Sequence, residues 1–195
     1  MKKLFLLSFF IIISTFLYAA PFGLKMGMTI EEIAELCEEE PYFEKDDVYI
    51  IKPIKSHPLF SYYRVYVNEK TGLYQISAIS DNIKCNQYGT ELQNAFNNLK
   101  DRIGKTYGKP QTIDKIDQNL RNIDKSDSHW FQTLKDGSRD LYAVWGEKIK
   151  LSDNLSKVEL KCVADSGYIS GNGHLVLYYY FNNASSVEDE QDSVF

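Results

Sequence analysis

Cysteine, histidine and tryptophan are scarce in this chain of 195 residues, which has three Cys, three His and two Trp. The histidines, His57, His129 and His174, form no H-x-x-x-H or H-x-x-E pair, so a zinc site would need ligands from distant parts of the chain. Positive charge is also limited, with 22 Lys and Arg against 27 Asp and Glu. An acidic protein repels the phosphate backbone of nucleic acids. We therefore expect no metal, no cofactor and no nucleic-acid partner.

Long apolar runs are confined to the opening MKKLFLLSFFIIISTFLYAA. Two lysines precede an apolar core at residues 4–17, and Ala19 and Ala20 are small residues at its end, a pattern that predicts a secretory signal peptide. Because Pro21 disfavours a cut directly before it, we place the cut after Ala19. An uncleaved anchor is the alternative, but the run is shorter than the ~20 residues that a membrane span needs. We expect a periplasmic or secreted protein with no stable membrane span after cleavage.

The longest stretch with a helical period is Thr90–Tyr107. Its large apolar residues recur at steps of three and four, so they share one side of a helix that needs a sheet or another helix to lie on. Thr90 and Gln93 predict a capping box at its start. Gly108 and the following proline predict its end.

A second capping box, Thr29 with Glu32, predicts a helix over Ile30–Glu39 that Pro41 stops. Each helix is followed by three stretches that alternate apolar and polar residues, as half-buried strands do. The two halves of the chain therefore match in plan. The predicted strands are Asp47–Pro53, Tyr62–Asn68 and Leu73–Ser80 in the first half, and Arg139–Trp145, Lys157–Ala164 and His174–Phe181 in the second.

From this plan we predict an α+β fold of two helix-plus-three-strand units, with an antiparallel sheet and helices packed on one side of it. The last residues of the chain are small, polar and acidic, which is typical of a disordered tail. The predicted parts are the signal peptide at 1–19, the first unit at 20–82, the second unit at 83–182 with an insert near 111–135, and the acidic tail at 183–195.

The doubled plan resembles the tandem fold of secreted β-lactamase inhibitor proteins. The segment Gly27–Leu36, GMTIEEIAEL, also resembles the Gly-Met-Thr helix start of the SmpA/OmlA (BamE-type) envelope proteins, in which a Gly-x-Pro break and a small antiparallel sheet follow. Here Tyr107–Pro110 carries that break in the second unit, and the lipid-bearing Cys of those proteins is missing. The resemblance implies a non-catalytic module that binds another protein on its sheet face. It transfers no functional residues.

The three cysteines, Cys37, Cys85 and Cys162, are expected in an oxidising compartment. Cys37 falls on the apolar face of the predicted first helix, which favours a buried thiol. Cys85 and Cys162 are then the possible disulfide. Three cysteines allow three pairings, and the sequence leaves the choice open.

No combination of residues predicts a catalytic site. Cys37 and His174 occur in an order that a thiol hydrolase could use, but the carboxylates of ELCEEE raise the pKa of the Cys37 thiol and keep it unreactive. The Gly-rich Gly167–Gly173 precedes a strand rather than the helix that a phosphate loop requires. We name no catalytic residue and expect no enzyme. An envelope hydrolase with an unidentified carboxylate or thiol site is the alternative.

Aromatic residues give the functional prediction. Alternation places Tyr62, Arg64 and Tyr66 on one face of a strand, and Tyr178 and Tyr180 on one face of another. Tyrosine and arginine are common at contact hot spots, although outward tyrosines also simply suit strands. We therefore expect an exported module that binds an envelope protein, in assembly or as an inhibitor, through this tyrosine-rich surface. A carrier that holds a small apolar molecule between helices and sheet is a further alternative.

Overall fold

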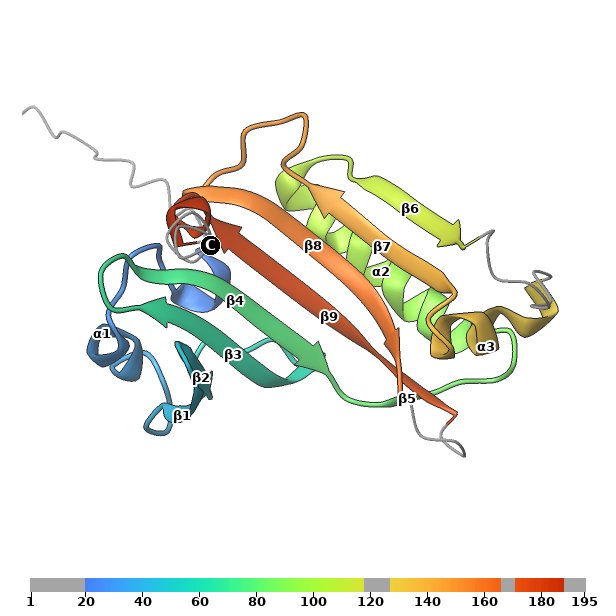
Figure 1. Cartoon of the computed structure of the whole chain (residues 1–195), viewed down its shortest axis with the longest axis horizontal. Helices are drawn as coiled ribbons and strands as arrows, with labels where there is room; N and C mark the ends of the chain where they lie inside the picture. The colour runs from blue at the N-terminus through green and yellow to red at the C-terminus, as the bar shows by residue number, and fades with distance from the viewer. Residues whose placement is uncertain (1–19, 118–126, 166–170, 188–195) are drawn as a thin grey trace, which may run out of the picture.

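The computed structural model describes residues 20–117, 127–165 and 171–187. In these residues nine strands form one sheet, and every hydrogen-bonded pair is antiparallel. The order is β1-β2-β3-β4-β9-β8-β7-β6, and the short β5 also pairs with β9 (Figure 1). The strands are β1 Tyr42–Lys45, β2 Val48–Ile51, β3 Phe60–Asn68, β4 Gly72–Ser80, β5 Ile83–Lys84, β6 Gln111–Ile116, β7 Arg139–Trp145, β8 Leu155–Ala164 and β9 Asn172–Phe181.

The prediction of two helix-plus-three-strand units is wrong. The last strand, β9, is hydrogen-bonded to β4 on one side and to β8 on the other, so strands from both halves of the chain share one sheet. Two separate three-stranded sheets would leave four edges exposed to pairing, whereas the joined path through the described strands ends only at β1 and β6. The pairing of Gln75 with Tyr180 shows how distant in sequence the joining contacts are.

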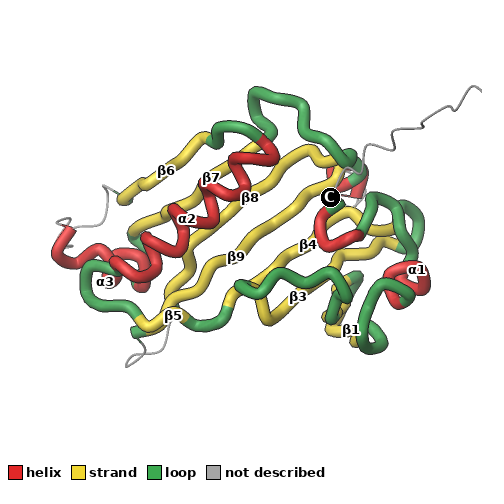
Figure 2. The backbone as a smooth tube through the Cα atoms, turned by 180° about the vertical axis from the view of Figure 1, so that it is seen from behind, coloured by secondary structure: helices red, strands yellow, loops and turns green. Residues whose placement is uncertain are grey.

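One face of the sheet is covered by α2, Thr90–Tyr107, the helix that its apolar period predicts. Figure 2 shows α2 lying across the sheet, where it contacts β8 and β9. Burial of each large apolar side chain contributes roughly 1.5–3 kcal/mol, so this stripe holds the helix on the sheet. The buried stripe is Leu92, Phe96, Leu99 and Ile103.

The capping box predicted at the start of α2 is wrong. The residue before the helix is Gly89, with φ of 63°, and no side chain caps the helix from that position. The side-chain oxygen of Asn86 instead accepts the amides of Tyr88 and Thr90, at 2.9 and 3.4 Å. The Gln93 side chain donates to the carbonyl of Tyr88. The helix therefore begins after a turn held by the Asn86 side chain and a left-handed glycine, and not at a threonine cap.

The capping box at Thr29 and Glu32 is confirmed, and it begins α1 at Ile30–Ala34. This helix ends earlier than predicted, because the chain turns into an extended bridge between Cys37 and Pro53. Cys37 is half-buried beside that bridge rather than on a helix face.

The segment before α1 packs against the β3–β4 hairpin by close backbone contact. It starts with the 3-10 turn η1, Pro21–Gly23. The amide of Gly27 donates to Leu73, and the amide of Leu73 donates to Met28, at 2.9 and 2.8 Å. Gly72 has φ of 69°, and a Cβ there would lie 2.2 Å from the carbonyl oxygen of Gly27. Only glycine allows this approach.

The six predicted strands correspond to β2, β3, β4, β7, β8 and β9, whereas β1, β5 and β6 were not predicted. In the predicted insert, β6 is followed, beyond residues 118–126, by η2 Asp127–His129 and by α3 Trp130–Lys135, which packs on β7 and β8. Residues 184–187 form a helical turn that buries Ala184 and Val187 against Tyr74, so the expected tail is ordered at its start. The predicted signal peptide and residues 188–195 lie outside the described residues. Among the described residues, no helix combines the length and apolarity needed to cross a membrane.

Candidate functional site

The structure brings all five predicted surface residues onto one face of the sheet, opposite α2. We call Tyr62, Arg64, Tyr66, Tyr178 and Tyr180 the tyrosine-rich face. They lie on β3 and β9, which are separated only by β4. Cross-strand rows join them, because Arg64 pairs with Ser77 and Ser77 with Tyr178, while Tyr66 pairs with Gln75 and Gln75 with Tyr180.

Charges on the tyrosine-rich face are balanced within the protein. The Arg64 guanidinium donates to the Glu44 carboxylate at 2.8 Å, and its centre lies 5.1 Å from the Tyr62 ring centroid. The Lys157 ammonium lies 4.0 Å from the Tyr180 ring centroid and 3.2 Å from the Glu159 carboxylate. The face is therefore aromatic and close to neutral rather than strongly charged.

The opposite face holds a groove that the sequence did not predict. It has a volume of about 430 Å³ and lies between α2, the start of the described chain and the loop that leads into β3. We call it the α2 groove. Its lining is Ala20, Pro21, Phe22, Gly23, Lys55, His57, Phe60, Leu99, Arg102, Ile103, Thr106, Tyr107, Leu177 and Tyr179.

Aromatic rings build one wall of the α2 groove. Phe22 meets the rings of Phe60, Tyr63 and Tyr179 edge to face, at centroid separations of 6.3, 4.9 and 5.8 Å. Its backbone has φ of 55°, in the left-handed region that a bulky residue rarely adopts. Strain of this kind costs about 1–3 kcal/mol and often occurs where structure serves a ligand. In this protein the strained backbone of Phe22 places its ring in the aromatic wall of the groove.

The charged side chains of the lining are basic. The groove is lined by Lys55, His57 and Arg102, whereas none of its lining residues is acidic. Lys55 and Arg102 are exposed, so they lie at the mouth, and His57 is half-buried. Burial and the nearby positive charge of Arg102 lower the pKa of His57. The charged side chains that line the groove are therefore basic, although the whole chain is acidic.

The tautomer of His57 follows from its hydrogen bond. The amide of Leu59 donates to Nδ1 of His57 at 3.1 Å, so Nδ1 is an acceptor and the proton of the neutral ring is on Nε2. The backbone around this loop is held by Tyr63, whose hydroxyl accepts from the amide of His57 at 2.9 Å. The loop is therefore fixed with a ring N–H available as a donor.

Tyrosines at the inner end of the groove remain protonated at high pH. Burial raises the pKa of Tyr107 to about 12, and the carboxylate of Asp153 adds to the shift. Burial also raises the pKa of Tyr179, with smaller contributions from Tyr107 and Tyr63. These phenols can act as neutral hydrogen-bond donors across the physiological range.

The three cysteines carry free thiols in this structure. The amide of Cys85 donates to the carbonyl of Gly171, just before β9, and Cys162 on β8 pairs with Leu175 of β9. Burial raises the pKa of both thiols. The Cys85–Cys162 disulfide is not formed here and stays a prediction for the oxidised protein.

Among the described residues, Cys37 and His174, the pair considered for a thiol hydrolase, are not brought together. Cys37 lies beside β2, whereas His174 is on β9 with β3 and β4 between, and its Nδ1 faces the Asp165 carboxylate at 3.4 Å. Burial raises the pKa of the Cys37 thiol. Most of the glycine-rich loop lies outside the described residues. Within the described ranges, no three His, Cys, Asp or Glu side chains are grouped to hold a metal ion.

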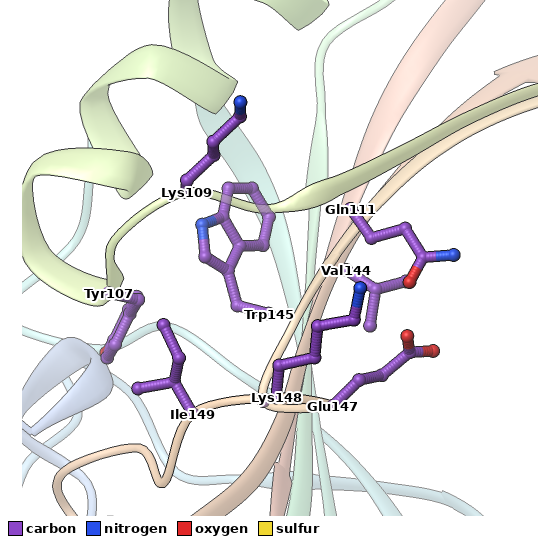
Figure 3. A pocket seen from close by; sticks show the side chains of 9 residues that line it. Tyr107, Lys109, Gln111, Val144, Trp145, Glu147, Lys148 and Ile149 are labelled. Atoms are coloured by element: carbon purple, nitrogen blue, oxygen red, sulfur yellow. The ribbon is translucent and has the colours of Figure 1, made fainter.

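An open hollow of about 420 Å³ lies at the C-terminal end of α2, and its lining, Lys100, Asp101, Gly104, Lys105, Gly108, Lys109 and Pro110, has no aromatic side chain. A further cavity at this end of the helix is too small for an organic ligand. Its volume is about 40 Å³, little more than the ~30 Å³ that one water occupies in the liquid. Figure 3 shows Tyr107 and Trp145 at this cavity with Lys148 and Glu147 nearby. The Trp145 indole donates to the carbonyl of Gly108 at 2.8 Å, which ties β7 to the end of the helix. We interpret the cavity as a structural feature.

Comparisons with known proteins found no match among family models, curated proteins or solved structures.

Proposed function

We propose that this chain is an exported binding protein that holds a small, mainly apolar molecule in the α2 groove. The observation that carries the proposal is a formed groove of about 430 Å³ between helix and sheet. Ligand sites typically have volumes of about 300–1,000 Å³, apolar walls and a few convergent polar groups. The α2 groove has all three properties. The N-terminal sequence supports export.

The shape of the lining supports a ligand rather than packing left incomplete. Well-packed interiors leave few voids larger than a water molecule. Here Leu99 and Ile103 of α2, Leu177 of β9 and the ring of Phe22 all border one continuous space. A ligand with an apolar body would bury these surfaces, and each buried CH₂ group contributes about 0.8 kcal/mol.

The proposal can be tested with a neutral fluorescent probe, N-phenyl-1-naphthylamine. Thr106 lines the groove at an exposed position of α2, so Thr106→Trp should fill the groove without disturbing the core. Asn98→Trp, at an exposed position of α2 outside the lining of the groove and of the hollow at the end of the helix, is the matched control. We expect the probe to bind the natural chain and Asn98→Trp, and to bind Thr106→Trp at least about tenfold more weakly.

Native mass spectrometry of the exported protein gives an independent readout, because a retained ligand adds mass that organic extraction removes. Absence of probe binding to the natural chain would overturn the proposal. Equal binding by Thr106→Trp and Asn98→Trp would place the probe elsewhere and would also count against it.

A second candidate function, recognition of an envelope protein, is favoured by the tyrosine-rich face. All five predicted residues lie together on the face opposite α2. Tyr66 also packs beside Tyr74, Ala184 and Val187, and the charge of Arg64 is paired with Glu44. The matching partner surface is therefore neutral and aromatic or aliphatic, with acceptors for tyrosine hydroxyls.

A photocrosslinking residue in place of Tyr62 should give one discrete protein adduct in cells, and the same residue in place of Asn98 on α2 should not. Combining the Tyr62 crosslinker with Arg64→Ala, Tyr66→Ala and Tyr178→Ala should abolish the adduct. No adduct from the Tyr62 position would remove this candidate.

A further inference from the structure

We infer that the ligand of the α2 groove is an anionic amphiphile, whose oxyanion headgroup binds Lys55, Arg102 and His57 while its apolar body lies against the aromatic and aliphatic wall. This inference rests on the proposed function and adds the chemical class of the ligand. The headgroup chemistry is that of a carboxylate or a phosphate monoester.

The first support is the sign and the pairing of the charges. Some basic residues on the sheet are matched by acids, as Arg64 is by Glu44 and Lys161 is by Asp140. Among the described residues, no ion pair is found for Lys55 or for Arg102. The chain has more acidic than basic residues, so two cations without an ion-pair partner at one groove mouth are a local excess of positive charge.

The second support is convergence from separate elements. Lys55 comes from the loop after β2 and Arg102 from the middle of α2, and both line the same groove. The Lys55 side chain lies across Gly23, since a Cβ on that glycine would be 3.3 Å from the Cδ of Lys55. The lysine stem is thus laid along the groove wall rather than extended into solvent, and its ammonium stays at the mouth.

The third support is the donor set. An oxyanion accepts several N–H donors, and an arginine fork can bind one bidentately. Arg102 supplies that fork and Lys55 an ammonium. His57 supplies Nε2–H in its neutral form, because Nδ1 is occupied by the amide of Leu59. Headgroup recognition therefore does not require His57 to be charged.

Processing of the chain would add a further cation. Ala20 lines the groove, so a cut after Ala19, the position that the sequence predicts, would place the new α-ammonium group at the same mouth. The protein for the following test is for this reason exported by the expression host, and its N-terminus is verified by mass spectrometry.

The experiment displaces N-phenyl-1-naphthylamine with laurate, lauryl phosphate or lauryl alcohol, which share one chain and differ in the headgroup. We expect the preferred anion to bind at least about tenfold more tightly than the alcohol at low salt, and the difference to shrink as salt is added. The laurate and lauryl phosphate arms distinguish a carboxylate ligand from a phosphate one.

Matched variants locate the headgroup site. Lys55→Gln combined with Arg102→Gln should remove most of the preference for the anion, because only His57 and the new α-ammonium group remain, while leaving the affinity for the alcohol within about twofold. Lys105→Gln removes one positive charge, as each member of the double variant does, at an exposed α2 position outside the groove lining, and it should leave the preference unchanged. All three positions are exposed, so thermal unfolding should be little altered.

The failures are distinguishable. Equal affinity for laurate, lauryl phosphate and lauryl alcohol would overturn the anionic class while leaving the apolar carrier intact. A double variant that weakens alcohol and anion alike would show that the two residues shape the groove rather than bind a headgroup. Absence of displacement by all three, with no probe binding, would overturn the proposed function itself.

Discussion

Two different structures cover the same face of the sheet. α2 is a regular helix of 18 residues that lies over β8 and β9 and buries a stripe of large side chains. The N-terminal segment, residues 20–36, covers the hairpin of β3 and β4 with one 3-10 turn, one short helix and backbone hydrogen bonds to Leu73. The first cover depends on side-chain packing, and the second depends on close backbone approach.

The difference explains where the groove lies. A helix with its side chains is about 10–12 Å wide, and neighbouring strands are about 4.8 Å apart, so one helix covers about two strands. The rest of this face needs another cover. Phe22 and the loop at His57 supply it, and the α2 groove lies between them and α2. Each cover contributes part of the basic mouth, Arg102 from α2 and Lys55 from the other side.

The largest effect that we expect comes from truncating the α2 stripe. Phe96 is 1 % exposed, and Phe96→Ala should lower the free energy of unfolding by about 3–5 kcal/mol, since it removes a buried ring and leaves a cavity. Asn98→Ala, on the exposed side of the same helix, should change it by less than about 0.5 kcal/mol. Urea denaturation followed by circular dichroism measures both. Similar midpoints for the two variants would contradict the packing role of the helix.

Substitution of Gly72 tests the second cover. Gly72→Ala forces a Cβ into the Gly27 carbonyl and keeps a positive φ, so it should cost about 2–4 kcal/mol. Gly104→Ala is the matched control on α2, where the new Cβ meets nothing within 4 Å. Alanine should instead stabilise that helix by about 0.5–1 kcal/mol. The two glycines should therefore shift the urea midpoint in opposite directions, and shifts of the same sign would contradict the close approach of the N-terminal segment.

Local sequence signals predicted much of the fold. Alternation identified β3 and β7, and the apolar period identified α2, because each of these elements buries one face more deeply than the other. Alternation also identified β4, although that strand is buried along nearly its whole length. The exposed edge strand β6, QTIDKI, has no such pattern, since neither of its faces is deeply buried. The prediction of two units was wrong because the strands of both halves of the chain pair in a single sheet. Which strand pairs with β9 is decided by contacts between distant parts of the chain.

The tyrosine-rich face and the groove also differ in how far local sequence patterns could predict them. The face could be predicted because the residues on each strand are spaced by two, and only the placement of β3 beside β4 and β9 was missing. The groove could not be predicted, because its lining comes from residues 20–23, 55–60, 99–107 and 177–179, and no period connects them. The Gly after Phe22 was the available local signal, since it marks an irregular start to the chain.

We expect a smaller loss of stability from substitutions at the N-termini of α1 and α2. Thr29 accepts the amide of Glu32, so Thr29→Ala should cost α1 about 1 kcal/mol. Thr90→Ala should cost less, because its amide is held by Asn86 and its hydroxyl accepts only a 3.4 Å bond. Hydrogen exchange of the first-turn amides in each helix measures the difference. Equal loss of protection would show that the two threonines act alike.

The last expected effect is on stability in alkaline solution, and it comes from Tyr107 at the α2 groove. The pKa of Tyr107 is raised to about 12 in the folded protein, above the usual value of about 10. Above pH 10 the unfolded chain therefore binds fewer protons than the folded one, and stability falls as pH rises. Tyr107→Phe should flatten this decline in urea midpoints above pH 9. Tyr88→Phe, at an exposed ring, should leave the decline nearly as steep, and an identical slope in both variants would mean that Tyr107 is not buried at the groove.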